Sequence, residues 1–176
     1  SNGSLSGSTS GPGTVVTTTT IAADGTREIY LFYTRDTHTV TLTKGTGINT
    51  VTGAGTYEYG ASVTINNTLN AGYSFVNWTV GTTSTAFATS QSKTFTMGTN
   101  DLTYKANGQL INYTITYNLN GGSVSSTNPT SYNVTTDTIT LPTPTKTGYT
   151  FGGWYNNSGL TGTAVTQIAT GSTGNK

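Results

Sequence analysis

The residues best suited to acid–base chemistry are few in this chain. The one histidine, His38, lies two residues after Asp36. An imidazole beside a carboxylate is the pairing that a Ser-His-Asp hydrolase uses, and His38 is the single candidate for that role. The six acidic residues are Asp24, Glu28, Asp36, Glu58, Asp101 and Asp137. Because they are scattered along the sequence, we interpret Asp36-Thr37-His38 as a polar turn and predict no catalytic residue and no enzymatic activity.

A self-formed bond between a lysine and an asparagine is the second chemistry to consider. Such a crosslink needs a carboxyl group in an apolar core, where desolvation raises its pKa. The candidates are Lys44, Lys93 and Lys105 with Glu58 or Asp101. Each lysine lies beside a turn or a strand end with polar neighbours, so the sequence does not favour a crosslink.

Composition excludes several classes of site. The chain has no cysteine and one histidine, which excludes disulfides, thiolate metal sites and multi-histidine metal sites. Six scattered acids do not favour calcium binding. A net charge of +1, with 7% charged residues, provides no basic surface for nucleic acid. The apolar runs are too short to span a bilayer. We therefore predict no metal, no cofactor, no nucleic-acid partner and no direct membrane insertion.

The same composition predicts an all-β or mostly β protein. The sequence contains 44 Thr and 11 Tyr, residues whose branched or flat side chains pack well on a pleated sheet. Net charge near zero and 10% aromatic residues are not the composition of a disordered chain.

An internal repeat organises the sequence into two units. The segment from Gly72 to Trp78 matches the segment from Gly148 to Trp154 at an offset of 76, and Gly47 falls on Gly122 at an offset of 75. We place the units at 38–111 and 112–176. In the first we expect strands near 38–43, 48–51, 61–66, 73–80, 92–97 and 101–106. In the second we expect strands near 113–119, 123–125, 136–141 and 149–155, with one helical turn within 158–169.

The repeated aromatic motif predicts two small, separate cores. Alternation along a strand places Tyr73 and Phe75 on one face, and Trp78 joins them only where a bulge or bend intervenes. The predicted core residues are Tyr73, Phe75, Trp78, Tyr149, Phe151 and Trp154. A solvent-facing cluster among Tyr57, Tyr59, Tyr132 and Tyr155 is the alternative that a binding module would require.

Residues 1–37 differ from the units that follow. Residues 1–14 are rich in Gly and Ser, which predicts a flexible linker. The run Glu28, Ile29, Tyr30, Leu31, Phe32 and Tyr33 precedes unit one as 102–106 precedes unit two. We interpret residues 27–35 as the closing strand of a preceding repeat.

The second unit carries a specific motif. It consists of Tyr113-Thr-Ile-Thr-Tyr-Asn-Leu-Asn-Gly-Gly122, followed by Leu141-Pro-Thr-Pro-Thr-Lys-Thr-Gly-Tyr-Thr-Phe-Gly-Gly-Trp-Tyr155. These residues resemble the internalin-type B-repeat, also called the Listeria–Bacteroides repeat, and unit one resembles its divergent form. The resemblance implies small β-grasp-like modules in an elongated, beads-on-a-string arrangement along secreted or wall-attached bacterial proteins. It also implies that they act as stalks and adhesive spacers without catalytic residues.

Three functions remain open at this point. The first is a structural spacer of a secreted or cell-surface bacterial protein, with neighbouring repeats of the same protein as its partners. The second is a segment of an extracellular fibre. The third is a module that binds a glycan or a host surface.

The fibre hypothesis depends on the last strand of the repeat. At the offset of 76, residues 102–106 fall on 178–182, so unit two is expected to lack its closing strand and to present an unpaired edge. One explanation is that the sequence is a window cut from a longer array of repeats. The other is that residues 27–35 of another copy complete that edge in a head-to-tail fibre.

Overall fold

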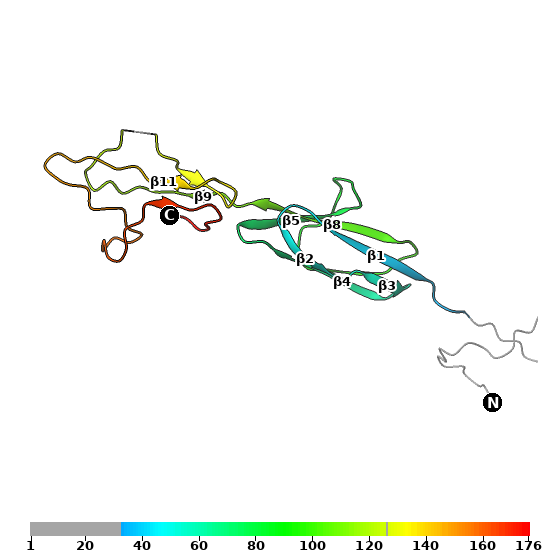
Figure 1. Cartoon of the computed structure of the whole chain (residues 1–176). Coiled ribbons are helices and arrows are strands. Elements are labelled where there is room, and N and C mark those ends of the chain that lie inside the picture. The colour runs from blue at the N-terminus through cyan, green and yellow to red at the C-terminus, as the bar shows by residue number, and fades with distance from the viewer. Residues whose placement is uncertain (1–32, 126) are drawn as a thin grey trace, which may run out of the picture.

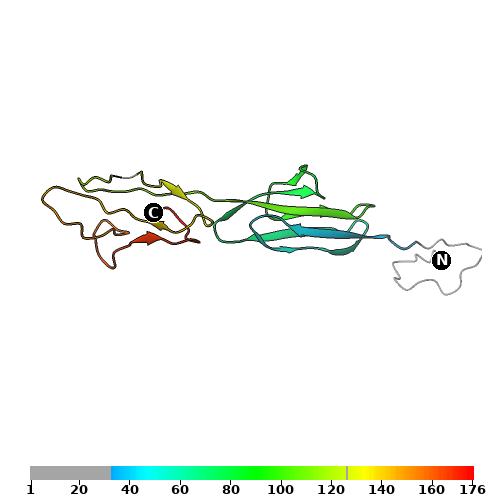
Figure 2. The same cartoon turned by 45° about the horizontal axis from the view of Figure 1, so that its top comes forward.

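The molecule is elongated, and its two parts follow one another along the long axis. Figure 1 shows the computed structural model, and Figure 2 shows the same arrangement from a second direction. The structure describes residues 33–125 and 127–176. We call residues 38–111 module one and residues 112–176 module two. The described residues contain no helix, so the all-β prediction is confirmed, and accordingly none of their elements is a helix able to span a membrane.

Module one consists of two facing sheets. The larger sheet has the order β3-β1-β8-β5-β6, and the smaller has the order β2-β4-β7. The strands are β1 (Thr37–Lys44), β2 (Ile48–Thr52), β3 (Gly55–Glu58), β4 (Ser62–Leu69), β5 (Tyr73–Val80), β6 (Ala86–Ala88), β7 (Lys93–Thr96) and β8 (Leu102–Leu110). Apolar residues of both sheets point into the space between them, which holds the core of the module.

The first and the last strand of module one lie side by side and run in the same direction. β1 pairs with β8 in parallel, with Val40 opposite Leu102 and Lys44 opposite Ala106. The other neighbour of β8 is β5, which is antiparallel to it. β8 therefore fills the centre of the larger sheet, and the chain leaves module one at the end opposite to the one where it entered (Figure 1).

A bulge in β5 explains how Phe75 and Trp78 share one core. The pairing with β8 shifts register between Phe75 and Asn77, which leaves Val76 as the extra residue. Because strand side chains alternate, one extra residue moves Trp78 onto the face that Phe75 occupies. The two rings lie 6.2 Å apart, and Trp78 is 0% exposed. The indole N–H donates to the carbonyl of Gln91 at 3.0 Å, so the largest buried ring has its polar group satisfied.

Module two has much less regular structure than module one. Its strands are β9 (Tyr113–Thr114), β10 (Ser131–Tyr132), β11 (Ile139–Thr140) and β12 (Gln167–Ile168). They form two antiparallel pairs, β9 with β10 and β11 with β12. The helical turn expected within 158–169 is wrong: this segment holds β12, and Val165 forms a bridge with Trp154.

The core of module two differs from the one expected. Its buried residues are Ile115, Tyr132 and Ile168. The sequence placed Tyr149, Phe151 and Trp154 in this core, but Tyr149 is 72% exposed and Phe151 is 39% exposed. Trp154 is half-buried and contacts Tyr117 and Phe151. The aromatic motif thus repeats in sequence without the same burial, and among the described residues no strand lies beside 149–153 as β8 lies beside β5.

The modules meet at a close contact. A Cβ atom added to Gly72, in the turn between β4 and β5, would lie 2.1 Å from Cγ1 of Val134, so Val134 sits directly on this glycine. The N–H of Ile111 donates to the carbonyl of Gly72 at 2.8 Å. The side-chain amide of Asn133 donates to Oδ1 of Asn112 at 3.2 Å. We call the contact of Val134 with the Gly72 turn the joint.

Several predictions concern residues 1–32, which the structure does not describe, or the overall arrangement of the repeats. The flexible segment 1–14 and residues Glu28 to Phe32 lie outside the described residues. Tyr33 is described and is exposed. The β-grasp likeness, the beads-on-a-string arrangement and the proposed boundaries stay predictions.

Removing each tryptophan should destabilise one module at a time, since the two buried clusters share no residue. Trp78→Ala should cost module one about 3–5 kcal/mol, and Trp154→Ala should cost module two less because that ring is half-buried. Each variant retains one tryptophan, so its fluorescence during urea unfolding reports on the untouched module alone. A shift of that module's midpoint by Trp154→Ala would contradict independent cores.

Gly72→Ala should loosen the joint. Gly72 and Gly148 have φ angles of +79° and +80°, so an alanine at either position costs about 1–2 kcal/mol for the backbone alone. A Cβ at Gly148 meets nothing within 4 Å, whereas one at Gly72 displaces Val134. We expect NMR relaxation to show more independent tumbling of the modules in Gly72→Ala than in Gly148→Ala. Adding Val134→Ala to Gly72→Ala should reverse part of the change; no difference between the two glycine variants would contradict the joint.

Candidate functional site

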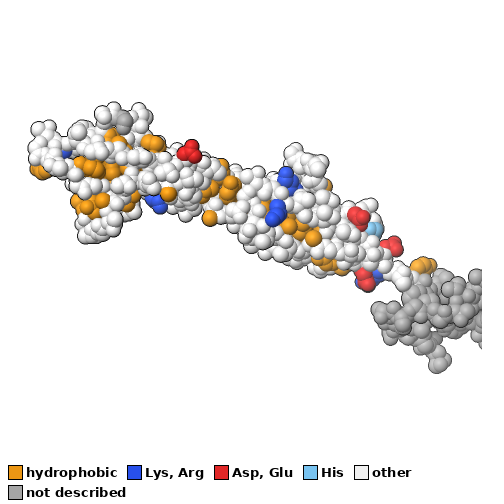
Figure 3. Space-filling model, in the orientation of Figure 1, with side chains coloured by type: hydrophobic (Ala, Val, Ile, Leu, Met, Phe, Trp, Pro, Cys, Tyr) orange, Lys and Arg blue, Asp and Glu red, His pale blue; other side chains and the backbone are white. Residues whose placement is uncertain are grey.

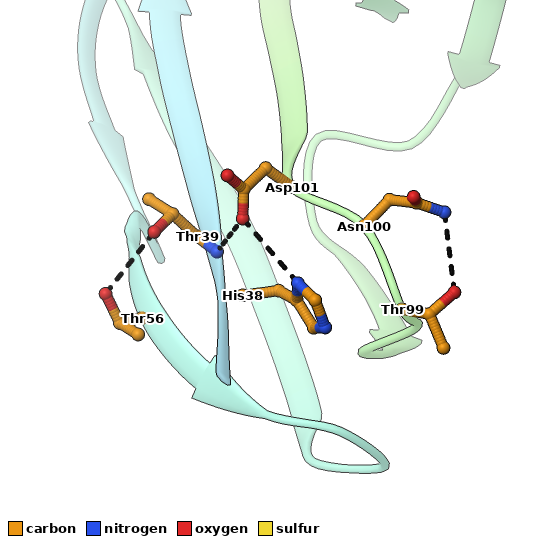
Figure 4. A network of polar contacts seen from close by, with 6 residues as sticks. All are labelled: His38, Thr39, Thr56, Thr99, Asn100 and Asp101. Carbon is orange, nitrogen blue, oxygen red and sulfur yellow. Dashed lines mark hydrogen bonds and ion pairs between the residues drawn. The ribbon is translucent and has the colours of Figure 1, made fainter. Parts of the chain in front are cut away.

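The single histidine lies at the start of the β1–β8 pair. Figure 4 shows His38 beside Asp101, with Nδ1 of the ring 3.8 Å from Oδ1 of the carboxylate. The same oxygen accepts a hydrogen bond of 2.7 Å from the backbone N–H of Thr39. Asp36, the sequence neighbour of His38, instead accepts a hydrogen bond at its carbonyl from the N–H of Tyr59. The sequence suggested that the carboxylate beside the imidazole is that of Asp36. In the structure it is that of Asp101, which is 63 positions after His38.

This cluster organises the backbone. Among the described residues no hydroxyl group forms a hydrogen bond with the ring of His38, so the arrangement supplies no activated nucleophile. The side chain of Asp101 is 76% exposed, and its firm contact is the backbone of β1. Its effect is to fix β1 against the residue that precedes β8.

Module two repeats this contact with a different side chain. The backbone N–H of Thr114 donates to Oδ1 of Asn175 at 3.0 Å, as Thr39 donates to Asp101. Thr114 is the counterpart of Thr39 at an offset of 75. A neutral amide oxygen can replace the carboxylate here, which indicates that the contact needs an acceptor atom and no charge.

The lysines considered for a crosslink lie at the surface. Lys44, Lys93 and Lys105 are all exposed, and Nζ of Lys44 donates to the carbonyl of Asn49 at 3.2 Å. Glu58 pairs with Arg35 at 3.9 Å, also at the surface. Within residues 33–125 and 127–176, no three His, Cys, Asp or Glu side chains gather in a way that could hold a metal ion.

The four tyrosines considered for a binding face do not form one cluster. Tyr132 is buried, and its hydroxyl donates to the carbonyl of Gly174. Burial raises the pKa of Tyr132, with a smaller contribution from Tyr113. Tyr57 packs against the core of module one and donates to the carbonyl of Gly53, whereas Tyr59 is exposed.

The end of module two that lies away from the joint has an open cleft. The cleft has a volume of about 640 Å³, and Gly121, Ser123, Tyr149 and Phe151 are among its lining residues. Nζ of Lys146 lies 4.5 Å from the ring centre of Tyr149 and donates to the carbonyl of Asn120 at 2.9 Å. In Figure 3, hydrophobic side chains are visible on the surface of module two, where charged groups are few.

A second feature of module two concerns the segments that correspond to β1 and β5. Residues 115–119 are the counterparts of β1 residues 40–44, and residues 149–155 are the counterparts of β5. In module one β8 lies between these two strands. In the part of module two that the structure describes, no backbone hydrogen bond joins 117–119 to 149–153. We call the space between them the slot.

The start of the slot is already paired. The N–H of Thr116 donates to the carbonyl of Lys176 at 2.8 Å, and the N–H of Lys176 donates to the carbonyl of Thr114 at 2.9 Å. In a parallel ladder, one residue forms backbone hydrogen bonds with the residues before and after the one it faces. Lys176 is bonded to Thr114 and Thr116 in this way, so it lies opposite Ile115. The same position in module one is occupied by Leu102, opposite Val40. Lys176 therefore lies beside Ile115 as Leu102 lies beside Val40.

Comparison with known proteins gives one family-model match for each module. Residues 38–111 match the family model described as the divergent InlB B-repeat domain. Residues 113–176 match the model described as the Listeria-Bacteroides repeat domain. No curated protein and no solved structure matches the chain.

Asp101→Ala should destabilise module one, whereas Asp101→Asn should not. Alanine leaves the N–H of Thr39 without its partner, which costs about 0.5–1.5 kcal/mol. Asparagine keeps an oxygen at this place, as Asn175 does in module two. Urea unfolding measures both variants in a Trp154→Phe background, where Trp78 is the single tryptophan and its fluorescence reports on module one. An asparagine variant as unstable as the alanine variant would show that charge, and not the acceptor atom, matters at this position.

Proposed function

Since its two modules belong to the divergent InlB B-repeat and the Listeria-Bacteroides repeat families, we propose that this protein is a non-enzymatic spacer of a secreted or cell-surface bacterial protein. Repeats of these families are typical of surface proteins and are typically non-catalytic. The spacing role itself is our proposal for this chain.

The path of the chain through module one is the observation that carries the proposal. Because β1 and β8 are parallel, the entrance and the exit of the module lie at opposite ends. β8 has nine residues and so spans about 30 Å. Each repeat of this kind adds its full length to the molecule, which is what a spacer requires.

The joint supports the same role. Val134 of module two packs on Gly72 of module one. Beside this contact, Ile111 is hydrogen-bonded within module one and Asn112 within module two, so both connecting residues are held by their own modules. A linker of this kind restricts bending, so that added length becomes added reach. Exposed threonines and few charges cover the outside, which suits a segment that stands in solvent without binding charged partners.

The contacts around His38 are consistent with a protein that is not an enzyme. Its firm contact is the hydrogen bond from the backbone of Thr39 to Asp101, and module two has the equivalent bond at Asn175. A contact repeated in both modules with a different side chain is explained by folding, with no need for a reaction.

Length is the property that tests a spacer. Inserting a second copy of residues 38–111 after residue 111 should lengthen the molecule by about 30 Å or slightly more. Small-angle X-ray scattering measures the maximum dimension of the full chain and of the insertion variant. The matched control inserts a Gly/Ser segment of equal residue number, which should give a broader distribution of lengths. Insertion of the repeat without a gain in maximum dimension would refute the spacer role.

A further inference from the structure

We propose that the turn at Asn120 and Gly121 is a self-modification site, where the asparagine side chain loses its amide group and Lys146 promotes the reaction. The reaction is a deamidation, which consumes one water molecule and needs no enzyme. The proposal does not rest on the spacer role, and it gives module two a chemical property of its own.

An asparagine that precedes a glycine reacts with its own backbone, because glycine has no side chain to obstruct the approach. The backbone nitrogen of the glycine attacks Cγ of the asparagine, so that an N–Cγ bond forms and the Cγ–Nδ2 bond breaks. Solvent base takes the proton of the backbone N–H, and the side-chain amide takes up a proton from solvent and leaves as ammonia. Water then opens the succinimide ring: attack at Cγ gives aspartate, and attack at the backbone carbonyl carbon gives isoaspartate.

The chain has three Asn-Gly pairs, and the structure describes two of them. These two are Asn107-Gly108 in module one and Asn120-Gly121 in module two, whereas Asn2-Gly3 lies outside the described residues. The two described pairs have the same local sequence and different surroundings, so each serves as a control for the other.

Asn107 is held in place on β8. Its side-chain amide donates to Oδ1 of Asn77 at 3.0 Å and to Oγ1 of Thr79 at 3.1 Å. The N–H of Gly108 donates to the carbonyl of Thr46 at 3.0 Å. Both groups that must react are thus engaged, and their reaction requires this part of the sheet to open.

Asn120 and Gly121 are the central residues of a tight turn, with φ angles of +47° and +79°. The N–H of Gly122 closes the turn by donating to the carbonyl of Leu119 at 2.8 Å. Asn120 and Gly121 are both exposed. Among the described residues, no hydrogen bond engages the side chain of Asn120 or the N–H of Gly121. The two reacting groups therefore meet without the loss of a hydrogen bond.

Lys146 acts on the peptide unit that joins the two residues. Its Nζ donates to the carbonyl oxygen of Asn120 at 2.9 Å. A Cβ atom added to Gly121 would lie 3.6 Å from the same Nζ, so the ammonium group lies over this peptide. When the N–H of Gly121 loses its proton, the negative charge is shared between that nitrogen and the Asn120 oxygen. A cation bonded to this oxygen stabilises the anion, so the attack becomes faster.

The same contact favours one of the two products. The backbone carbonyl carbon of Asn120 becomes part of the succinimide ring, and donation from Lys146 makes it more electrophilic. Attack of water at this carbon gives isoaspartate. The free carboxylate of isoaspartate contains the oxygen to which Lys146 donates, so the product gains an ion pair.

Incubation of the folded full chain in neutral buffer, followed by peptide mapping with mass spectrometry, tests the proposal. The mass difference between an amide and a carboxyl group measures the reaction at each Asn-Gly pair. We expect Asn120 to react at least about tenfold faster than Asn107 while the chain is folded. In urea the two pairs should react at similar rates, since the contacts that distinguish them are then lost.

Variants of Lys146 test its part in the reaction. Lys146→Met removes the charge from a side chain of similar length and should slow the reaction at Asn120 by about threefold. It should also lower the share of isoaspartate, which electron-transfer fragmentation distinguishes from aspartate. Lys146→Arg keeps the charge and should restore both the rate and the share of isoaspartate. In urea, or at Asn107, Lys146→Met should have no effect.

Two results would overturn the proposal. One is an Asn120 that reacts no faster than Asn107 in the folded chain. The other is a reaction whose rate and share of isoaspartate are both unchanged by Lys146→Met. Neither result affects the spacer role, which depends on molecular length and not on the chemistry of this turn.

Discussion

The parallel pairing of β1 with β8 is the interaction on which module one depends. It joins the two ends of the module in sequence, and it creates the central strand of the larger sheet. The buried residues Val40, Tyr104 and Ala106 all lie on these two strands. The capping contact of Asp101 with Thr39 begins the pair, and the hydrogen bond from Gly45 to the carbonyl of Ala106 extends it. Without β8 the core would be open to water along its whole length.

Module two shows how a related sequence packs with less regular structure among its described residues. Its aromatic motif has the same ring contact, with Phe151 and Trp154 5.9 Å apart and Phe75 and Trp78 6.2 Å apart. The local geometry of the motif is therefore set by its own residues. Burial is not set locally, because Trp78 is fully buried under a complete sheet and Trp154 is not.

The sequence predicted local features well and long-range features poorly. Strands β1, β2, β4, β5 and β7 lie close to their expected positions, since their alternation and turn residues are local signals. β3 and β6 were not expected, because Gly55–Glu58 and Ala86–Ala88 are short edge strands with little pattern of their own. The exposure of Tyr149 could not be predicted from the repeated motif, whose first copy is largely buried. Exposure of this ring depends on contacts with residues that are distant in sequence. The contact of His38 with Asp101 escaped prediction for the same reason.

The direction of β1 relative to β8 also determines how module one responds to pulling. Force applied between the two ends of the module acts along both strands in opposite senses, so the backbone hydrogen bonds of the β1–β8 pair are loaded together in shear. Strands arranged as a hairpin would instead be peeled apart one bond at a time. The five residue pairs from Val40–Leu102 to Lys44–Ala106 therefore act as a mechanical clamp, and the core residues beneath them are protected until the whole set gives way. A protein exposed to flow at a surface would keep its length under load through this one pair of strands.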